Sequence, residues 1–586
     1  MAGSSRSYNP SRKPDIREMR DTGGKNGMDG KEDIEMKDKE DKMDKMEDQY
    51  EDQYLSAVGN IGKWQLRSIL TLGIFCIPVA FHVLIMTFMN AKVESWCARP
   101  AHLSSLNLST WRTVSGQVNQ SCQIINTTWT LFSLTDLENL SVFPNEENSL
   151  IDCTEWEYDT SQFISTITGE FNLVCSREYL VSTAQTLYFI GMIFGVFTFG
   201  VLADYIGRKT VMIPLLMLVG VTGIGTAMAP TFELFMACRM INAFFLIGIW
   251  ETQFTYSIEL VGGRWSTIVG MGMEYFWVTG WLIMAILGYL IRSWRTLMLS
   301  VSIPILPAFL LFWLVDESPR WLISRDKLKK AEDIIRGLCK TNRKVLDSAW
   351  TLKPVKKKNE DEEDKRKTNI LDLFRTPNMR IKTFIIWYNF FVNAFVYYGL
   401  TLNSGDLGGG NVFLSFTISG LLEIPAYGLA IIVLLKYGRR FPYSGSLVLS
   451  GIFLLCISLV PKGVYQEDWP AMALAQLGKF CITFAFGALF VYSAELVPTV
   501  IRTGTIGSAS FIGRLGGIIA PWVGGLSSVN PHLPVWIFGT NAILAGLCAF
   551  CLPETAGKPL AYTIQESEKL AVHLPCRNRK ISSENI

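Results

Sequence analysis

The chain has 586 residues, of which 49% are hydrophobic and 18% charged, and its formal net charge is +2. This length would allow several soluble domains, but apolar stretches of about 20 residues recur along it, each long enough to cross a bilayer core as a helix. The pattern excludes a string of soluble domains and predicts an all-α polytopic membrane protein. Twelve spans are expected, at residues 66–89, 179–201, 210–229, 231–253, 265–289, 295–316, 380–402, 411–435, 443–461, 470–494, 503–527 and 532–552.

The segment before the first span is polar and dense in both charges. Residues 22–54 have almost no branched apolar side chains, so they cannot bury enough surface to fold alone. No cleavable signal peptide is visible, because the first apolar run is of full membrane-spanning length. We interpret residues 1–60 as a disordered cytoplasmic tail, with a regulatory or docking role as the alternative.

Charge segregation predicts the orientation in the membrane. Residues 90–178 hold four Lys/Arg and eleven Asp/Glu, whereas residues 320–382 hold nineteen and ten. Because Lys and Arg stay on the cytoplasmic side, the first segment is expected outside, and the second segment and both termini inside. The outer segment also carries four N-glycosylation sequons and four cysteines, which allow three disulfide pairings in an oxidising compartment. These residues are Asn107, Asn119, Asn126 and Asn139, and Cys97, Cys122, Cys153 and Cys175.

A cytoplasmic linker with short helices is expected at residues 317–380. Near its start, Leu328, Ile334, Ile335 and Leu338 could form one apolar stripe of a short helix. The later part is a run of charges and is interpreted as a solvated linker, with contact to anionic lipid as the alternative.

Three motifs recur at a nearly constant offset, which indicates a chain built twice from one plan. Two six-helix halves are therefore predicted, at 61–316 and 381–553, followed by a cytoplasmic tail at 554–586. Parallel repeats of this kind place a substrate site near the bilayer midplane, between halves that rock to alternate access. The offsets are 231 residues between Gly207 and Gly438, 236 between Glu259 and Glu495, and 237 between Glu317 and Glu554.

The first of these motifs, GVLADYIGRK at 200–209, places a carboxylate and two cations at one cytoplasmic turn. Gly200 is expected to permit close helix packing, and Asp204 to accept hydrogen bonds from helix N-terminal amides or to pair with Arg208. Such contacts would latch the outward-facing state, and a basic stop beside a span is the alternative. The second copy, LLKYGRR, has Leu435 in place of the aspartate, so a weaker latch is predicted there. The predicted gate-latch residues are Gly200, Asp204, Gly207, Arg208, Lys209, Glu259, Arg264, Gly438, Arg439, Glu495 and Arg502.

These motifs resemble those of one transporter family, solute carrier family 22 of the major facilitator superfamily, which comprises organic cation, organic anion and carnitine carriers. The resemblance runs from about residue 60 to 560, with Tyr205 where a basic residue is usual. It implies a plasma-membrane uptake carrier, similar to carnitine- or zwitterion-type and insect organic-cation-transporter-like members. The other matching segments are CTEWEYDTSQFISTITGEFNLVC at 153–175, DESPRWLIS at 316–324, DLFRTPNMR at 372–380, AELVPTVIRTG at 494–504 and LPETAG at 552–557.

Ionisable residues inside the spans are candidates for substrate or proton pathways, because charge is costly in a bilayer. Arg514 falls near the middle of span eleven, and its guanidinium can bind a carboxylate bidentately. The resemblance implies an Asp at this position in cation carriers and an Arg in carnitine and anion carriers, which favours a zwitterion or an anion. The alternative is that Arg514 only pairs with a helix carboxylate such as Glu423. The remaining ionisable residues are Arg239, Glu251, Glu274, Glu423 and Lys479.

Two of these charges and a group of aromatic side chains complete the predicted site. Lys479 could supply a second charge for a carboxylate, and Glu423 could take an ammonium group or a coupling ion, with a structural role as the alternative for each. Four aromatic side chains, Trp250, Phe254, Tyr397 and Tyr398, could cage an ammonium group, a contact worth about 0.5–2 kcal/mol. Trp250 and Phe254 share one helix face, and plain packing is the alternative. The predicted substrate-binding residues are Arg514, Lys479, Glu423, Trp250, Phe254 and Tyr397, with Tyr398 beside them.

The sequence therefore predicts a carrier for a small zwitterion such as carnitine, β-alanine or a related amino acid. An organic-cation carrier for amines such as carcinine, and a non-transporting receptor or scaffold, are the alternatives. Without a metal-ligand cluster, nucleophilic triad or phosphate-binding loop in the sequence, no enzymatic activity, metal or cofactor is expected. The expected partners are a small organic solute and the lipid bilayer, not nucleic acid, and coupling to sodium or protons is left open because both use carboxylates and carbonyls.

Overall fold

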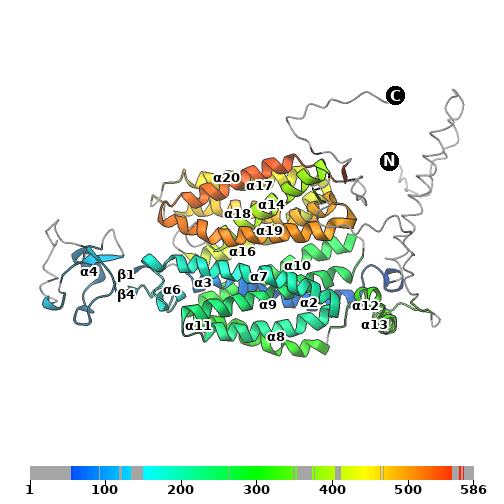
Figure 1. Ribbon diagram of the computed structural model, residues 1–586, viewed down its shortest axis with the longest axis horizontal. Coiled ribbons are helices and arrows are strands. Elements are labelled where there is room, and N and C mark those ends of the chain that lie inside the picture. Colours follow the sequence, from blue (N-terminus) through cyan, green and yellow to red (C-terminus); the bar gives the residue numbers. More distant parts are fainter. Residues whose placement is uncertain are drawn as a thin grey trace, which may run out of the picture. The chain divides into compact units, whose positions relative to one another are not determined.

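Long α-helices make up most of the chain on either side of the cytoplasmic linker (Figure 1). Residues Val58–Ile586 form one unit. The computed structural model describes residues 54–91, 93–117, 122–127, 129–133, 137, 150–262, 264–313, 315–347, 350–352, 373–374, 376–402, 411–461, 464–465, 468–556, 567–568 and 572. Of the predicted disordered tail, residues 1–53 lie outside these residues, as does the charged run of the linker, whereas residues 54–58 are helical and correct the prediction at the end of the tail.

Two groups of helices correspond to the two predicted halves. The N-terminal half contains α2 (Lys63–Leu84), α3 (Met86–Met89), α7 (Tyr179–Ile206), α8 (Arg208–Ala227), α9 (Phe232–Glu259), α10 (Arg264–Leu290) and α11 (Trp294–Ser302), followed by the 3₁₀ segment η4 (Ile303–Trp313). The C-terminal half contains α14 (Pro377–Leu402), α16 (Val412–Tyr437), α17 (Arg440–Ile457), α18 (Trp469–Leu496), α19 (Thr499–Gly525) and α20 (Leu533–Phe550), with the 3₁₀ turn η8 (Leu526–Ser528) between the last two.

Among the described residues, eleven helices are long and apolar enough to cross a membrane, one fewer than expected. The expected span 295–316 is not one α-helix, because α11 gives way to η4 at Ile303. Pro304 and Pro307 explain the change, since proline has no N–H for the α-helical ladder and its ring clashes with the preceding turn. At 1.5 and 2.0 Å per residue the two segments together span roughly 30–35 Å, so the chain still crosses a bilayer here.

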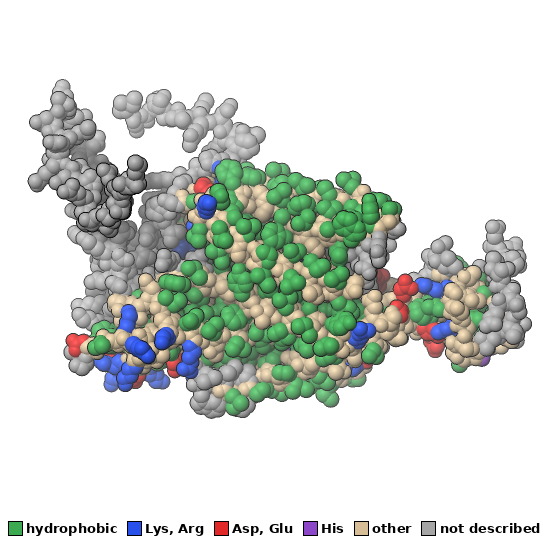
Figure 2. Space-filling model, turned by 180° about the vertical axis from the view of Figure 1, so that it is seen from behind, with side chains coloured by type: hydrophobic (Ala, Val, Ile, Leu, Met, Phe, Trp, Pro, Cys, Tyr) green, Lys and Arg blue, Asp and Glu red, His purple; other side chains and the backbone are tan. Residues whose placement is uncertain are grey.

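The two halves meet along two helix pairs, α7 with α19 and α10 with α16. In Figure 1 the helices of the C-terminal half lie along one side of these seams and those of the N-terminal half along the other. Hydrophobic side chains cover most of the bundle surface that faces the viewer in Figure 2, while Lys and Arg side chains gather over the linker helices at one end. We call the end with the linker helices the inner end and the end with residues 93–175 the outer end.

The segment at the outer end is a small disulfide-linked domain. Its two antiparallel ladders pair β1 (Ser95–Cys97) with β4 (Trp156–Tyr158) and β2 (Gln123–Ile125) with β3 (Leu150–Asp152). Disulfides join Cys97 to Cys153 and Cys122 to Cys175, which selects one of the three pairings that the sequence allows. The short helical elements are η1 (Ala101–Leu103), α4 (Leu108–Val114), η2 (Trp129–Leu131), α6 (Ile167–Glu170) and η3 (Cys175–Arg177).

Two of the four sequon asparagines can be placed in this domain. Asn107 is exposed and caps α4, because its side chain accepts a hydrogen bond from the N–H of Ser109 at 3.1 Å. Asn126 is exposed just after β2. Asn119 and Asn139 lie outside the described residues, so glycosylation of all four stays a prediction.

The linker begins with two short helices, α12 (Pro319–Ser324) and α13 (Leu328–Thr341). The helix expected from the apolar stripe is confirmed as α13, on which Ile335 and Leu338 are buried. In the C-terminal tail, Glu568 accepts hydrogen bonds from the N–H groups of Asn378 at 2.9 Å and Met379 at 3.1 Å, so it caps the start of α14.

Candidate functional site

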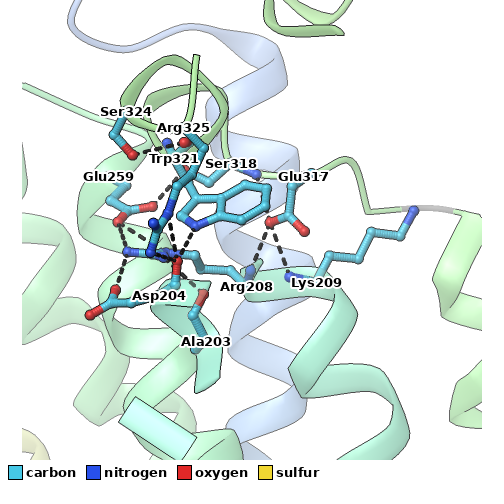
Figure 3. Close-up of polar contacts among 10 residues, drawn as sticks. All are labelled: Ala203, Asp204, Arg208, Lys209, Glu259, Glu317, Ser318, Trp321, Ser324 and Arg325. Carbon is cyan, nitrogen blue, oxygen red and sulfur yellow. Dashed lines mark hydrogen bonds and ion pairs between the residues drawn. The ribbon is translucent and has the colours of Figure 1, made fainter. Parts of the chain in front are cut away.

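The turn between α7 and α8 is held by the carboxylate of Glu317, which follows the last span of the N-terminal half in the sequence. Gly207 has a φ of +118°, a conformation that glycine adopts readily. Beyond it, Glu317 Oε1 accepts hydrogen bonds from the N–H groups of Arg208 at 2.9 Å and Lys209 at 3.1 Å (Figure 3). The carboxylate therefore caps the positive N-terminus of α8.

The Arg208 side chain ties α7, α8 and α9 together. Its Nη2 lies 2.8 Å from Glu259 Oε1 and 2.9 Å from Asp204 Oδ1, and its Nη1 donates to the carbonyl of Ala203 at 2.9 Å. The Arg208 and Glu259 side chains are mostly buried, whereas the Asp204 side chain is 68% exposed. The strong partner of Arg208 is therefore Glu259, and the Asp204 contact is a surface ion pair.

Two linker side chains bind the same turn. Figure 3 shows Trp321 and Arg325 converging on the carbonyl of Asp204, to which Trp321 Nε1 donates at 2.7 Å and Arg325 Nη2 at 2.7 Å. Ser318 caps α12 and donates from Oγ to Glu259 Oε2 at 2.5 Å. We name Arg208, Glu259 and Glu317 the N-terminal bracket, because they bind the ends of several helices of one half together.

The C-terminal half repeats this arrangement almost atom for atom. Arg439 donates to Glu495 from Nη2 at 3.0 Å and from Nη1 to the carbonyl of Leu434 at 3.0 Å. Glu554 accepts from the N–H groups of Arg439 at 2.9 Å and Arg440 at 3.0 Å, and Gly438 has a φ of +89°. Partial burial of Glu554 acts to raise its pKa, but the backbone N–H groups that it accepts from outweigh this and hold the pKa below its ordinary value. Arg439, Glu495 and Glu554 form the C-terminal bracket.

These contacts correct two parts of the predicted latch. The bracket contacts join elements within the same half, so they make each half rigid and do not themselves latch one half to the other. Close packing at Gly200 is also wrong, because this residue is exposed and no heavy atom lies within 4 Å of where its Cβ would stand. The Arg264 side chain lies outside the described residues, and Arg502 is half-buried at the start of α19.

Two sets of hydrogen bonds between the halves lie toward the outer end. On the α7–α19 seam, Thr186 donates to the carbonyl of Ile518 at 3.2 Å and accepts from Trp522 Nε1 at 2.8 Å. On the α10–α16 seam, Trp281 Nε1 donates to the carbonyl of Phe416 at 2.9 Å, and the two rings stack. These contacts close the outer end of the bundle.

Lys479 and Glu423, both predicted to bind substrate, are bonded to each other. Lys479 Nζ lies 3.4 Å from Glu423 Oε1, and their side chains are 2% and 0% exposed. Tyr397 donates to the same carboxylate oxygen at 2.7 Å, and the Lys479 ammonium sits 3.3 Å from the centre of the Tyr397 ring. Lys479 also donates to Thr401 Oγ1. In this structure the lysine occupies the aromatic face that was predicted for a substrate ammonium.

Arg514 pairs with a different carboxylate from the one expected. Its Nη2 lies 2.6 Å from Oε1 of Glu251, and its Nη1 donates to the carbonyl of Ser510 at 3.2 Å. Glu251 belongs to α9 of the N-terminal half and Arg514 to α19 of the C-terminal half. The proposed pairing with Glu423 is therefore wrong, because the fold turns α9 toward α19 at this level.

The remaining candidates line the same interface. Glu274 on α10 is half-buried and in electrostatic contact with Glu423 and Tyr427 on α16. Trp250 is half-buried and packs edge-to-face on Trp277, with ring centroids 5.5 Å apart. Tyr398, in electrostatic contact with Arg514, is also half-buried, as is Phe254. Together with the two ion pairs they form an acidic and aromatic region between the halves.

Arg239 does not lie between the two halves but inside the N-terminal half. Its Nη2 donates to the carbonyl of His82 at 2.7 Å, and its guanidinium lies 4.3 Å from the centre of the Tyr188 ring. These partners belong to α2 and α7, so Arg239 packs helices of the N-terminal half together.

Some residues of the site were missed. Glu317 and Glu554 were recognised only as the ends of the repeats, although their common offset of 237 residues already marked them as equivalent. Glu251 was noted but given no role, since a helix position does not specify which helix it faces. The positions of Trp321 and Arg325 in the sequence do not indicate that their side chains bind the carbonyl of Asp204.

A family model described as "Sugar (and other) transporter" matches residues 153–565. The chain is 33% identical over 526 residues to the organic cation transporter protein of Drosophila melanogaster, covering 88% of this chain and 94% of that protein. It is 32% identical over 538 residues to solute carrier family 22 member 3 of Mus musculus, covering 89% and 96%. It is also 32% identical over 527 residues to solute carrier family 22 member 13 of Homo sapiens, covering 88% and 93%.

Solved structures resemble the fold at low sequence identity. The inward open conformation of the xylose transporter XylE from E. coli has a TM-score of 0.54 at 15% identity, covering 86% of this chain and 99% of that chain. The proton:xylose symporter XylE bound to 6-bromo-6-deoxy-D-glucose has a TM-score of 0.54 at 16% identity, covering 87% and 99%. At this identity the likeness bears on the fold alone, which is that of the major facilitator superfamily.

Proposed function

Because the chain belongs to solute carrier family 22 of the major facilitator superfamily, we propose that it is an alternating-access carrier for a small zwitterion, such as carnitine, β-alanine or a related amino acid, across the plasma membrane. The observation that carries the proposal is a cation in the inter-half region, Arg514, whose side chain is 15% exposed and therefore within reach of a ligand. Its guanidinium offers the fork geometry that binds a carboxylate bidentately.

The amine of the substrate is assigned to the acidic and aromatic side of the same region. Glu251 and Glu274 supply carboxylates, and Trp250 and Tyr398 supply aromatic faces, which attract an ammonium group through their ring quadrupoles. The Lys479–Glu423 pair is assigned a supporting role within the C-terminal half, because each charge already neutralises the other. Breaking that fully buried pair to bind substrate would leave an uncompensated charge.

Transport follows from the repeat architecture. The two brackets hold each half rigid, and the seams between the halves are the parts that open. Opening the outer end requires the contacts of Thr186, Trp522 and Trp281 to break, and opening the inner end requires the packing of Met271 on Ala430 and Phe484 to break. The halves then rock about the central site, as parallel-repeat carriers do.

An organic-cation carrier is the second candidate, and the charges of the region favour it. Three carboxylates, Glu251, Glu274 and Glu423, face two cations, Lys479 and Arg514, which leaves a net formal charge of −1. The names of two relatives from Drosophila melanogaster, an organic cation transporter protein and an organic cation transporter-like protein, support the same class. In this case Arg514 would be structural, and amines such as carcinine would be the substrates.

Radiotracer uptake separates the candidates. Cells that carry the protein at their surface are given carnitine, β-alanine, carcinine and tetraethylammonium, with and without sodium and at two external pH values. The zwitterion proposal expects Arg514→Ala to lose zwitterion uptake and to keep cation uptake, while Arg67→Ala, at an exposed position of α2, leaves both unchanged. Zwitterion uptake that survives Arg514→Ala would contradict it, and a surface-expressed protein that accumulates no tracer would indicate a receptor or scaffold.

A further inference from the structure

Among the residues that the structure describes, one ion pair joins the two halves inside the membrane. Glu251 is the twentieth residue of α9 and Arg514 the sixteenth of α19, counted from helices that begin at Phe232 and Thr499. The pairs Arg208–Glu259, Arg439–Glu495 and Lys479–Glu423 each stay within one half. A rocking motion preserves contacts within a half but stretches a contact between halves, so the Glu251–Arg514 pair is the one that the transport cycle must act on.

The pair is also open to a ligand. The Glu251 side chain is 35% exposed and the Arg514 side chain 15% exposed, whereas both charges of the Lys479–Glu423 pair are buried. The contact uses one carboxylate oxygen and one guanidinium nitrogen, at 2.6 Å. Within the part of the chain that the structure describes, Oε2 of Glu251 and Nε of Arg514 take part in no hydrogen bond. A carboxylate from outside can therefore approach the arginine and form a bidentate pair that Glu251 does not form.

From this geometry we propose that Glu251 is the resident counter-ion of Arg514 and that it selects zwitterions. When substrate binds, the substrate carboxylate replaces Glu251 on Arg514, and the freed Glu251 carboxylate binds the substrate ammonium. The inference rests on the proposed function and adds the residue that sets the substrate class. Trp250 precedes Glu251 on α9, and its half-buried ring packs edge-to-face on Trp277 of α10.

Within the Glu251–Arg514 pair itself, charge balance favours a zwitterion. A plain cation can pair with Glu251 but leaves Arg514 without a counter-ion, and a plain anion can pair with Arg514 but leaves Glu251 without one. An unpaired charge in a poorly hydrated site is costly. A zwitterion replaces the internal ion pair by two new ones, so neither charge is left alone when the halves separate.

The test uses β-alanine and two derivatives of the same skeleton. β-Alanine methyl ester keeps only the ammonium, and N-acetyl-β-alanine keeps only the carboxylate. For the unmodified protein, each derivative is expected to inhibit β-alanine uptake at least about tenfold more weakly than unlabelled β-alanine does, because one charge of the pair stays unmatched. Equal inhibition by either derivative would overturn the proposal, and this arm needs no variant that might misfold.

Charge-removing variants then test the roles of the two residues. Glu251→Gln should raise the KM for β-alanine by about tenfold or more and shift the preference toward N-acetyl-β-alanine, and Arg514→Gln should shift it toward the methyl ester. Glu251→Asp, which keeps the charge, should keep the preference of the unmodified protein. Glu233→Gln, an exposed position in the first turn of the same helix, is the matched control.

The outcomes separate this inference from the proposed function. If the unmodified protein takes up neither β-alanine nor carnitine, the proposed function fails. If it takes them up and Glu251→Gln, present at the cell surface, leaves both the KM and the order of preference unchanged, the proposed function stands and the role of Glu251 is refuted.

Discussion

Replacing Gly207 by alanine tests whether the brackets hold each half together. Gly207 has φ 118° and ψ 156°, a region that is essentially restricted to glycine. A Cβ at this position would stand 2.4 Å from Oε2 of Glu317 and 3.2 Å from the Trp321 ring. The Glu317 side chain is flexible, but it is held by the N–H groups of Arg208 and Lys209, so it can move only by giving up hydrogen bonds.

The expected cost can be worked out from these contacts. The backbone strain is about 1–3 kcal/mol, and the loss of one hydrogen bond to a charged group is about 1.5–3 kcal/mol. Gly207→Ala should therefore destabilise the protein by about 3–6 kcal/mol. Gly200→Ala, seven residues earlier on the same helix, meets no atom within 4 Å and should be neutral or slightly stabilising, because alanine is the better helix former by about 1 kcal/mol.

The measurement compares the two variants for thermal stability in detergent, by the loss of the monodisperse peak in size-exclusion chromatography after heating, and for the fraction that reaches the cell surface. We expect Gly207→Ala to have a clearly lower thermal midpoint and lower surface expression, and Gly200→Ala to behave as the unmodified protein. The reasoning would be refuted if Gly207→Ala were as stable as the unmodified protein, or if Gly200→Ala were equally damaged.

Two further predictions concern single bracket residues. Asp204→Asn should change the free energy of unfolding by less than about 1 kcal/mol, because that side chain is 68% exposed. Glu259→Gln should lower it by about 2–4 kcal/mol, because it leaves the buried Arg208 poorly compensated. Equal effects of the two variants on the thermal midpoint would contradict the assignment of Glu259 as the main partner of Arg208. The pKa of Glu554 in the folded protein lies below the ordinary value for a glutamate. Its ionised form therefore stabilises the fold fully when the pH is above the ordinary pKa, and this contribution is lost as the pH falls through the lowered pKa. Glu554→Gln should therefore lower the thermal midpoint at neutral pH, and the difference should shrink toward strongly acidic pH; a difference independent of pH would argue against this linkage.

The repeat was the most predictive feature of the sequence. Motif pairs separated by 231–237 residues indicated equivalent positions in two halves, and the structure gives them equivalent partners, with Arg208 bound to Glu259 and Arg439 bound to Glu495. This worked because the same motifs recur in the same order in both halves, so equivalent positions meet equivalent partners even though Arg208 and Glu259 lie 51 residues apart and Arg439 and Glu495 lie 56 residues apart.

Contacts within the membrane were less predictable. Helical periodicity places a residue on a face, but it does not specify how neighbouring helices are rotated. Arg514 does pair with a helix carboxylate, as the alternative stated, but the carboxylate is that of Glu251 and not the suggested Glu423. The same limit applies to Gly200, which lies on an exposed face. The sixth span kept its apolar composition but lost its α-helical form at Pro304 and Pro307, where the backbone chemistry of proline outweighs hydropathy.

Uptake of labelled β-alanine and carnitine by the unmodified protein and by Arg514→Ala, at matched surface expression, tests the central claim most directly. The account predicts saturable zwitterion uptake that Arg514→Ala abolishes, with tetraethylammonium uptake retained. Zwitterion uptake by Arg514→Ala with an unchanged KM would contradict it.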